Sequence, residues 1–484
     1  MIVKIALLSD MHLDKQIALP ERRGDFADIF LLRAVRRLNR FIKPDITVIL
    51  GDLINQGSSS AARENLQRMK NIVDILESPS IVLPGNHDGD VDTFYNIFNR
   101  PDDHLDVKGV RFVPFIDPDE PGYNARRTEH DLERMAFARR NFNGRLVALQ
   151  HVPLFPPGQS DCPYNYTNAD EIITVMRKSG YCLSLSGHYH NGMQILRDED
   201  ISFLAVPALC ESPFTFWEVL LDDKHVNVIH HRLQMPTELR LIDRHVHTPY
   251  AYCSENMDIA KSLTLAREFG LADIIFTEHS SHLYYDRSSI YTLRHFAEND
   301  CLKKTSSYRY NHYFADLEKA NVATTSIGLE IDSDYCGRPM LLPEDRSRIH
   351  FFIGSVHGLQ TLSRGEPDTD KVCDDFLAVH KKFLTNGLDV LAHPFRIFNR
   401  SQRPVPEQLF LPMIDLLRKN NVAAEINFHG DIPPAQFFKL CIEAGIKLSL
   451  GSDSHNLCDI GEFVPHLELL KTIGYNGDIK DILL

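Results

Sequence analysis

Apolar runs of strand length recur along the first half of the chain, and each one ends in polar residues that can bind metal ions. The runs at 2–9, 46–50 and 81–83 are apolar at nearly every position, which is typical of strands covered on both faces. Segments with helical spacing of apolar residues lie between them, at 31–41 and 61–76. Open α/β sheets place their chemistry at the carboxyl ends of parallel strands. The pattern therefore predicts an α/β fold with a polar site along one sheet edge.

Further apolar runs predict a second sheet in this half. Two of them, at 146–150 and 183–186, lead into His151 and into Gly187-His188-Tyr189-His190. Four short runs separated by polar breaks then follow, at 194–196, 201–206, 216–221 and 226–229. Their spacing indicates antiparallel strands that close the second sheet of an α/β sandwich.

The same alternation of strand and helix patterns returns after residue 240. The run 241–246 contains His245 and leads to His247, and alternate residues of a strand share one face. Counting this run, we expect seven strands, each ending in possible ligands. These ends are His245 with His247, Glu278 with His279, Glu330, His357, His393, Glu425 with Asn427, and Asp453 with His455. The alternation predicts a parallel barrel with its active site at the carboxyl rim.

The chain length agrees with a division into two domains. The 484 residues exceed what one typical core accommodates. A polar connection at 234–238 separates the two patterned halves. We therefore expect domains at 1–234 and 240–484.

Composition indicates which partners and which cellular compartment to expect for the protein. A net charge of −14 disfavours a surface built for non-specific nucleic-acid binding, which needs clustered Lys and Arg. The nine cysteines include no Cys-x-x-Cys pair and do not suggest a disulfide framework, which favours a reducing cytoplasm. The N-terminus runs into Asp10 and His12 without the features of a signal peptide. Because no apolar run approaches the ~18 residues of a membrane span, we expect no membrane partner.

Taken one at a time, the polar residues of the first half have ordinary explanations. A lone Asp at a strand end, such as Asp52, is more often a cap or turn residue, and Asn86 would suit a turn. Together they provide nitrogen and oxygen ligands and a carboxylate that can bridge, which is what a pair of divalent cations needs. Independent caps would not assemble such a set.

The first half, about 1–234, resembles the calcineurin-like metallophosphoesterases. The resemblance lies in Asp10-x-His12, Gly51-Asp52, Gly85-Asn86-His87-Asp88, His151 and Gly187-His188-x-His190, in that order. It implies an α/β sandwich with two metal ions. Asp10, His12 and His190 would hold one ion, Asn86, His151 and His188 the other, and Asp52 would bridge them. His87 would donate a proton to the leaving oxygen, and Asp88 would orient His87.

The second half, about 240–484, resembles the polymerase and histidinol phosphatase (PHP) superfamily, in its histidinol-phosphatase-like branch. The resemblance implies a distorted (β/α)7 barrel with two or three metal ions. His245, His247, Glu330 and Asp453 would surround one ion, Glu330 would bridge to a second held by His357 and His393, and His279 and His455 would hold a third. Cys253 stands where this branch commonly has a histidine. A thiolate binds zinc well and suits manganese or iron poorly.

Two features outside the ligand sets invite functional hypotheses. Arg396, three residues after His393, is more often a solvated charge, and our hypothesis places it near the substrate phosphate. The segment 282–313 is rich in tyrosine and arginine. Its aromatic side chains either pack within an inserted loop or belong to a substrate lid, in which an aromatic ring stacks on a base.

Both halves point to hydrolysis of phosphate esters by metal-activated water. Our leading hypothesis is a bifunctional enzyme for a small phosphate ester or nucleotide. The first half would open a phosphodiester, including cyclic or nucleotide diesters, and the second would remove the resulting monoester. Manganese, iron or zinc would suit both ligand sets. A nuclease that trims DNA or RNA and two independent phosphomonoesterases stay open as alternatives. A purely structural metal role is disfavoured, because structural sites are saturated by protein ligands.

Overall fold

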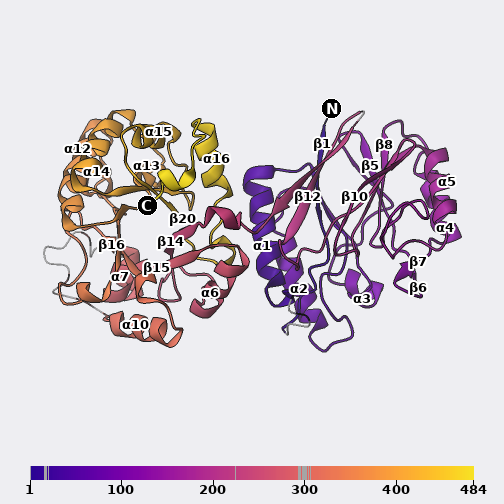
Figure 1. The fold of residues 1–484 in the computed structure, drawn as a ribbon, viewed down its shortest axis with the longest axis horizontal. Helices are drawn as coiled ribbons and strands as arrows, with labels where there is room; N and C mark the ends of the chain where they lie inside the picture. The colour runs from indigo at the N-terminus through magenta and orange to yellow at the C-terminus, as the bar shows by residue number, and fades with distance from the viewer. Residues whose placement is uncertain are drawn as a thin grey trace. The chain divides into compact units, whose positions relative to one another are not determined.

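A computed structural model describes residues 2–15, 19, 21–223, 225–292, 296, 302, 305 and 307–484. The chain forms two compact units, Met1–Gln234 and Met235–Leu484 (Figure 1). Each unit has its own sheets and its own core. Within the described ranges, we find no helix with the length and apolar character that crossing a membrane requires.

The first unit contains two sheets packed face to face. One sheet has the order β13-β12-β1-β2-β3 and the other β10-β11-β9-β8-β5-β4. The strands of the first are β1 (Val3–Leu8), β2 (Ile46–Ile49), β3 (Ser80–Val82), β12 (Thr215–Leu221) and β13 (Val226–Arg232). Those of the second are β4 (Leu105–Val107), β5 (Val110–Pro114), β8 (Arg145–Leu149), β9 (Tyr181–Ser186), β10 (Met193–Asp198) and β11 (Ile201–Ala205). A small hairpin pairs β6 (Asp119–Glu120) with β7 (Asn124–Ala125).

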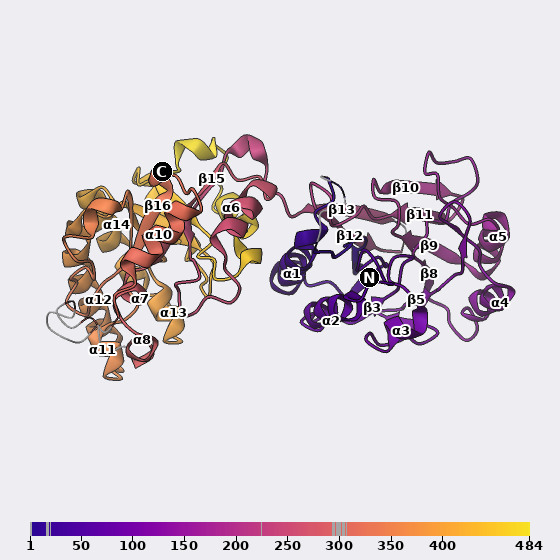
Figure 2. The same ribbon diagram turned by 90° about the horizontal axis from the view of Figure 1, so that it is seen from below.

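Helices cover the outer faces of this sandwich. They are α1 (Ala27–Arg37), α2 (Ala62–Val73), α3 (Val91–Tyr95), α4 (Glu129–Phe137) and α5 (Ala169–Ser179). Figure 2 shows α1 and α2 on the opposite side of the strands from α4 and α5. Between the sheets, Ile5 and Val48 of one sheet join Phe112 and Val147 of the other in one buried core. The predicted α/β sandwich is confirmed.

The expected pairing of the strands after residue 193 is partly wrong. β10 and β11 do belong to the second sheet, but β11 runs parallel to β9. β12 and β13 extend the first sheet instead, with β12 antiparallel to β1. The buried positions of β12 form a nearly continuous run, so its sequence pattern fits either sheet. Pairing across the whole unit decides between them.

The second unit is a barrel of seven parallel strands in sequential order from β14 to β20. They are β14 (Ile242–Val246), β15 (Asp273–His279), β16 (Ile327–Asp332), β17 (Phe351–Ser355), β18 (Val390–Leu391), β19 (Ala423–Asn427) and β20 (Leu448–Gly451). A single bridge between Val246 and Ser454 joins the first strand to the segment after the last. The predicted distorted seven-stranded barrel is confirmed.

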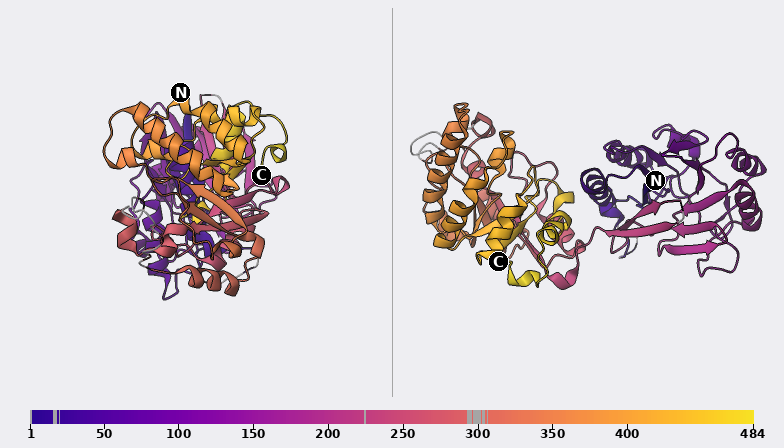
Figure 3. Two further views of the ribbon diagram at one scale, coloured as in Figure 1. Left: turned by 90° about the vertical axis from the view of Figure 1, so that its left-hand side faces the viewer. Right: turned by 90° about the horizontal axis from the view of Figure 1, so that it is seen from above.

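Helices surround the barrel strands (Figure 3). The longer ones are α6 (Ile259–Glu268), α10 (Tyr310–Lys319), α12 (Thr369–Phe383), α14 (Phe410–Asn420), α15 (Ala435–Glu443) and α16 (Val464–Thr472). Short helices follow the carboxyl ends of the strands: α7 (Ser280–Tyr284), α8 (Arg287–Thr292), α11 (Gln360–Ser363) and α13 (Arg396–Arg400). The rim of the barrel is therefore built from loops and short helices, which is where this architecture places its chemistry.

Candidate metal centres

The carboxyl ends of five strands meet at one edge of the first unit. Asp10 follows β1, Asp52 follows β2, Asn86 follows β3, His151 follows β8 and His188 follows β9. Close approach of these ends requires glycine. A β-carbon on Gly85 would lie 2.6 Å from the backbone nitrogen of Asp52 and 2.7 Å from Cε1 of His151.

Asp10, His12 and His190 form the first group of ligand atoms. Nε2 of His12 lies 3.0 Å from Nε2 of His190 and 3.7 Å from Oδ1 of Asp10. Nε2 of His190 lies 3.5 Å from the same oxygen of Asp10. The structure thus brings together the three residues expected at one ion.

Asn86, His151 and His188 form the second group. Nε2 of His151 lies 3.2 Å from Oδ1 of Asn86 and 3.1 Å from Nδ1 of His188. Oδ2 of Asp52 lies between the two groups, 3.6 Å from Nε2 of His12 and 3.4 Å from Nε2 of His151. Asp52 therefore occupies the position that a bridging carboxylate requires.

Two of the ring nitrogens that face away from these groups have partners of their own. Nδ1 of His151 lies 2.6 Å from the carbonyl of Leu50, and Nδ1 of His190 lies 2.6 Å from Oε1 of Glu211. Oδ1 of Asp10 is buried and has no hydrogen-bond partner among the described residues. Oriented imidazoles around an unpartnered carboxylate oxygen are what a bound cation needs. The residues present therefore fit a pair of divalent metal ions.

Neighbouring carboxylates raise the pKa values of two histidines in this cluster. Burial by itself lowers the pKa of His151, but the carboxylate of Asp52 outweighs it and raises that pKa to about 10. Burial likewise opposes protonation of His190, whereas hydrogen bonds to Asp10 and Glu211 raise its pKa to about 9. Cations binding here would displace these protons.

Several of these residues hold the left-handed backbone conformation that non-glycine residues rarely adopt. The φ angles are 57° at Asp10, 49° at His12, 54° at Asp52 and 64° at His188. In the second unit, His393 and Asp453 have φ angles of 30° and 52°. Such strain persists where the surroundings fix it, and it concentrates at functional sites.

His87 and Asp88 differ in how they contact the site. Nδ1 of His87 lies 2.8 Å from the carbonyl of Asn55, and the ring packs edge-on against His12 at 4.7 Å between centroids. Asp88 was expected to orient His87, but its carboxylate accepts hydrogen bonds from the backbone of Leu53, Ile54 and Gly85 instead. Asp88 therefore ties two loops together, and a backbone carbonyl orients the ring of His87.

In the second unit, Glu330 lies at the centre of the ligand set. Its Oε1 lies 3.0 Å from Nε2 of His393 and 3.4 Å from Nε2 of His357. Its Oε2 lies 3.5 Å from Nε2 of His245 and 3.7 Å from Nε2 of His247. The two oxygens of one carboxylate thus face two histidine pairs, as a bridge requires.

Asp453 completes the first of these groups. Its Oδ1 lies 2.9 Å from Nε2 of His247 and 3.6 Å from Nε2 of His245. Nε2 of His245 is buried and has no hydrogen-bond partner among the described residues, whereas Oε2 of Glu330 lies 2.5 Å from Nδ1 of His279. The unpartnered nitrogen fits a bound cation in this unit as well.

Three carboxylates that we did not assign as ligands orient histidines of this site. Nδ1 of His245 lies 2.8 Å from Glu425, that of His247 lies 3.3 Å from Glu278, and that of His357 lies 2.7 Å from Asp332. Each contact leaves Nε2 directed at the centre. Glu278 and Asp332 lie on strands, beside or near predicted ligands. This position was the only feature of the sequence that could have indicated their orienting role. Glu211 in the first unit carried no such signal.

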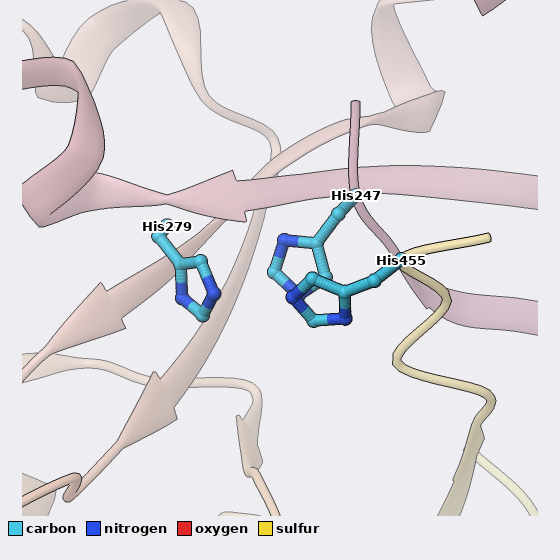
Figure 4. Close-up of side chains that lie close together, drawn as sticks. All are labelled: His247, His279 and His455. Carbon is cyan, nitrogen blue, oxygen red and sulfur yellow. The ribbon is translucent and has the colours of Figure 1, made fainter. Parts of the chain in front are cut away.

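The residues expected at a third ion lie next to this pair of groups. Figure 4 shows the imidazoles of His247, His279 and His455 directed toward one region. The ring centroid of His247 lies 4.2 Å from those of both His279 and His455. Sγ of Cys253 lies 3.8 Å from Nε2 of His279. His282, which the sequence analysis missed, joins Cys253 and His279 in a second possible ligand group.

Arg396 is buried rather than solvated. Its side chain donates to Oδ2 of Asp453 at 2.5 Å and to Oδ1 of Asn427 at 2.7 Å. Arg400, one turn further along α13, is exposed. Both arginines line a cleft of about 450 Å³ in the second unit. The helix thus directs one arginine at a metal ligand and a second at the open cleft.

Part of the tyrosine-rich segment 282–313 lies outside the described residues, namely 293–295, 297–301, 303–304 and 306. Among its described members, Tyr284 and Tyr310 are buried with nearly parallel rings, and the hydroxyl of Tyr284 donates to Asp345. These two residues have the packing role. Tyr291 is 60% exposed and lines the cleft of the second unit, so the lid hypothesis rests on it.

Comparison with known families matches each unit to one family model. The model for calcineurin-like phosphoesterases matches residues 3–192, and the model for the PHP domain matches residues 243–429. Together the two matches form a tandem arrangement.

Individual relatives each resemble less than half of the chain. A probable cyclic nucleotide phosphodiesterase of Xenorhabdus bovienii is 25% identical over 224 residues, which is 42% of this chain and 87% of that protein. Metallophosphoesterase 1 of Danio rerio is 24% identical over 262 residues, 43% of this chain and 68% of that protein. A solved dimetal phosphatase from Danio rerio aligns with a TM-score of 0.37 and 16% identity, over 48% of this chain and 96% of its own.

Proposed function

The chain consists of a calcineurin-like phosphoesterase domain followed by a PHP domain, and it is a metal-dependent phosphoester hydrolase; from this premise we propose that it carries out two hydrolyses in sequence. The first domain opens a phosphodiester, and the second removes the phosphate of the resulting monoester. The observation that carries this proposal is the presence of two separate ligand clusters, one around Asp52 and one around Glu330.

Bound divalent cations would supply an activated water and neutralise the phosphate oxygens at each site. In the first domain, Asp10, His12 and His190 would hold one cation, and Asn86, His151 and His188 the other, with Asp52 between them. His87 lines the cleft and would deliver a proton to the leaving oxygen. The carbonyl of Asn55 keeps its ring in place.

In the second domain, Glu330 would bridge two cations, one held with His245, His247 and Asp453 and the other with His357 and His393. A third would rest on His279 and His455 with Cys253. Manganese, iron or zinc suits the imidazole and carboxylate ligands, and the thiol adds a preference for zinc at the third position. Arg400 lines the cleft and would bind the phosphate dianion of a monoester.

The first cleft, of about 520 Å³, is larger than the second, of about 450 Å³, and so has more room for a second substituent on phosphorus. The relative from Xenorhabdus bovienii is named as a probable cyclic nucleotide phosphodiesterase, and the calcineurin-like phosphoesterase model matches residues 3–192 of this chain. We therefore assign the diester to the first domain.

Single-site variants assayed on two generic substrates test the proposal. Asp52→Asn should lower hydrolysis of bis(4-nitrophenyl) phosphate by more than about 100-fold and spare 4-nitrophenyl phosphate. His245→Ala should do the reverse. Asp106→Asn and His130→Ala, which change surface residues, serve as matched controls and should behave like the parent. If both site variants abolished the same single activity, two sequential hydrolyses would be ruled out.

A further inference from the structure

Three tyrosines line the cleft of the first domain beside the metal ligands. Tyr123, Tyr164 and Tyr189, here called the tyrosine wall, come from three different loops. The ring of Tyr164 packs edge-on against His188 at 4.7 Å between centroids. It lies 6.2 Å from the ring of Tyr123 and 6.3 Å from that of Tyr189. The wall therefore begins at a metal ligand and extends outward along the cleft.

The ring of Tyr123 is held in the open by a strained backbone. The side chain is 65% exposed, which is unusual for a residue of this size. Its φ is 61° and follows a φ of 81° at Gly122, so two successive residues are left-handed in the turn between β6 and β7. The carbonyl of Tyr123 also lies 3.1 Å from Nε2 of His188. This turn thus contacts a metal ligand through its backbone and carries an exposed ring.

Hydrogen bonds lock the loops of Tyr123 and Tyr164 together. Asn124 Oδ1 accepts from the backbone N–H of Asn165 at 3.0 Å, and the backbone of Ala125 pairs with Asn165 and Thr167 on either side. The two rings are therefore positioned before a ligand arrives. A preformed binding surface loses less entropy on binding than a flexible one.

The chemistry of the outer cleft favours a flat, uncharged group. Besides the tyrosines it is lined by Glu21, Glu211 and Arg22, and Arg22 is paired with Glu211 at 3.4 Å. These acidic residues disfavour a second anionic group at this place. Aromatic rings bind planar groups by stacking, and every nucleobase has a planar face.

We propose that the tyrosine wall binds the base of a nucleotide diester while the adjoining ligand cluster binds its phosphate. This inference rests on the proposed diesterase activity and specifies its substrate as a diester of a nucleoside. Tyr123 and Tyr164 are then specificity-determining residues. Stacking on one base should contribute about tenfold in affinity.

The test compares two ligands that differ only in the base. Adenosine 5′-monophosphate and ribose 5-phosphate are used as inhibitors of bis(4-nitrophenyl) phosphate hydrolysis, in the full chain carrying His245→Ala to silence the second site. The nucleotide should inhibit about tenfold more tightly. Tyr123→Ala and Tyr164→Ala should each bring the ratio of inhibition constants toward one without changing inhibition by ribose 5-phosphate. Tyr123→Phe should keep the ratio.

A matched control separates stacking from a general loss of surface aromatics. Phe137 on α4 is 63% exposed and lies outside the cleft, so Phe137→Ala should leave the ratio unchanged. A ratio near one in the parent, or an unchanged ratio in both alanine variants, would overturn the inference. If the parent failed to hydrolyse the diester at all, the proposed function would fail instead. Calorimetric binding of the same two ligands would then still decide whether the wall recognises a base.

Discussion

The ring of His87 is held through one nitrogen and lines the first cleft. Its Nδ1 contacts the carbonyl of Asn55, which leaves Nε2 for a substrate. His87→Ala should slow hydrolysis of diesters with alkyl leaving groups by about 10²- to 10⁴-fold, because those oxygens need a proton. The loss should be much smaller for 4-nitrophenolate, which leaves unprotonated. Steady-state rates on both substrate classes, with elemental analysis showing unchanged metal content, measure this. Equal losses on both would contradict it.

Cys253 should mark the third metal position of the second domain. A thiolate bound to cobalt gives a charge-transfer absorption in the near ultraviolet, so the cobalt-substituted protein should show this band and Cys253→Ser should lose it. The readout does not depend on activity. Cys336 is also exposed and free, and Cys336→Ser should retain the band. Its persistence in Cys253→Ser would exclude the thiol as a ligand.

At the scale of single residues, the ligand sets could be predicted from the sequence, but the residues that orient the ligands could not. Asp52 follows β2 and Glu330 lies within β16, and strand periodicity together with motif spacing points to both. Glu211 orients His190 from a loop 21 positions away in the chain, and only folding brings the two together. Asp88 was given a role toward its neighbour His87, yet its carboxylate binds backbone groups of another loop. Such contacts depend on three-dimensional packing.

Close packing of the strand ends makes glycine necessary at position 85. A β-carbon there would collide with Asp52, which occupies the bridging position, and with the ring of His151. Gly85→Ala should therefore abolish diester hydrolysis while sparing monoester hydrolysis in the second domain. Gly365→Ala is the control, because it adds a β-carbon in open space at a left-handed turn. It should cost only about 1 kcal/mol of stability and no activity, as measured by thermal melts and both assays.

Helix α13 presents two arginines with separate roles. Arg400→Ala should raise the Michaelis constant for 4-nitrophenyl phosphate about tenfold, since one charge-assisted contact to phosphate would be lost. Arg396→Ala should instead lower metal content, because Arg396 holds the carboxylate of the buried Asp453 in position through a 2.5 Å contact. Arg418→Ala on the surface of α14 should change neither quantity. An unchanged Michaelis constant in Arg400→Ala would remove Arg400 from the phosphate site, and an unchanged metal content in Arg396→Ala would contradict the role of Arg396 toward Asp453.

Elements with strong periodicity were predictable, and those set by distant pairing were not. The strands at 46–50 and 81–83 appear within a residue of their expected bounds as β2 and β3. Strands β4, β6 and β7 were missed because they are short and partly exposed, so their sequences lack a continuous apolar run. The sheet to which β12 belongs follows from its pairing with β1, more than 200 residues away.

At the scale of the whole molecule, one chain contains two different folds, and each gathers metal-binding side chains around a carboxylate. The sandwich gathers ligands from the ends of strands in two sheets, with Asp52 between two groups. The barrel gathers them around one rim, with Glu330 between two groups. Both surround a carboxylate with histidines, and several of these histidines are held through their second ring nitrogen. The two sites therefore share a chemistry while presenting different clefts to a substrate.

Metal stoichiometry tests the central claim most directly. Protein saturated with manganese or zinc and freed of unbound metal should hold more than one ion per chain by elemental analysis. Asp52→Asn should remove ions from the first domain only, and His245→Ala from the second only, each with loss of the matching activity. Chelation should abolish both activities. A parent protein that holds no more than a single ion per chain, or that retains both activities after chelation, would contradict the account.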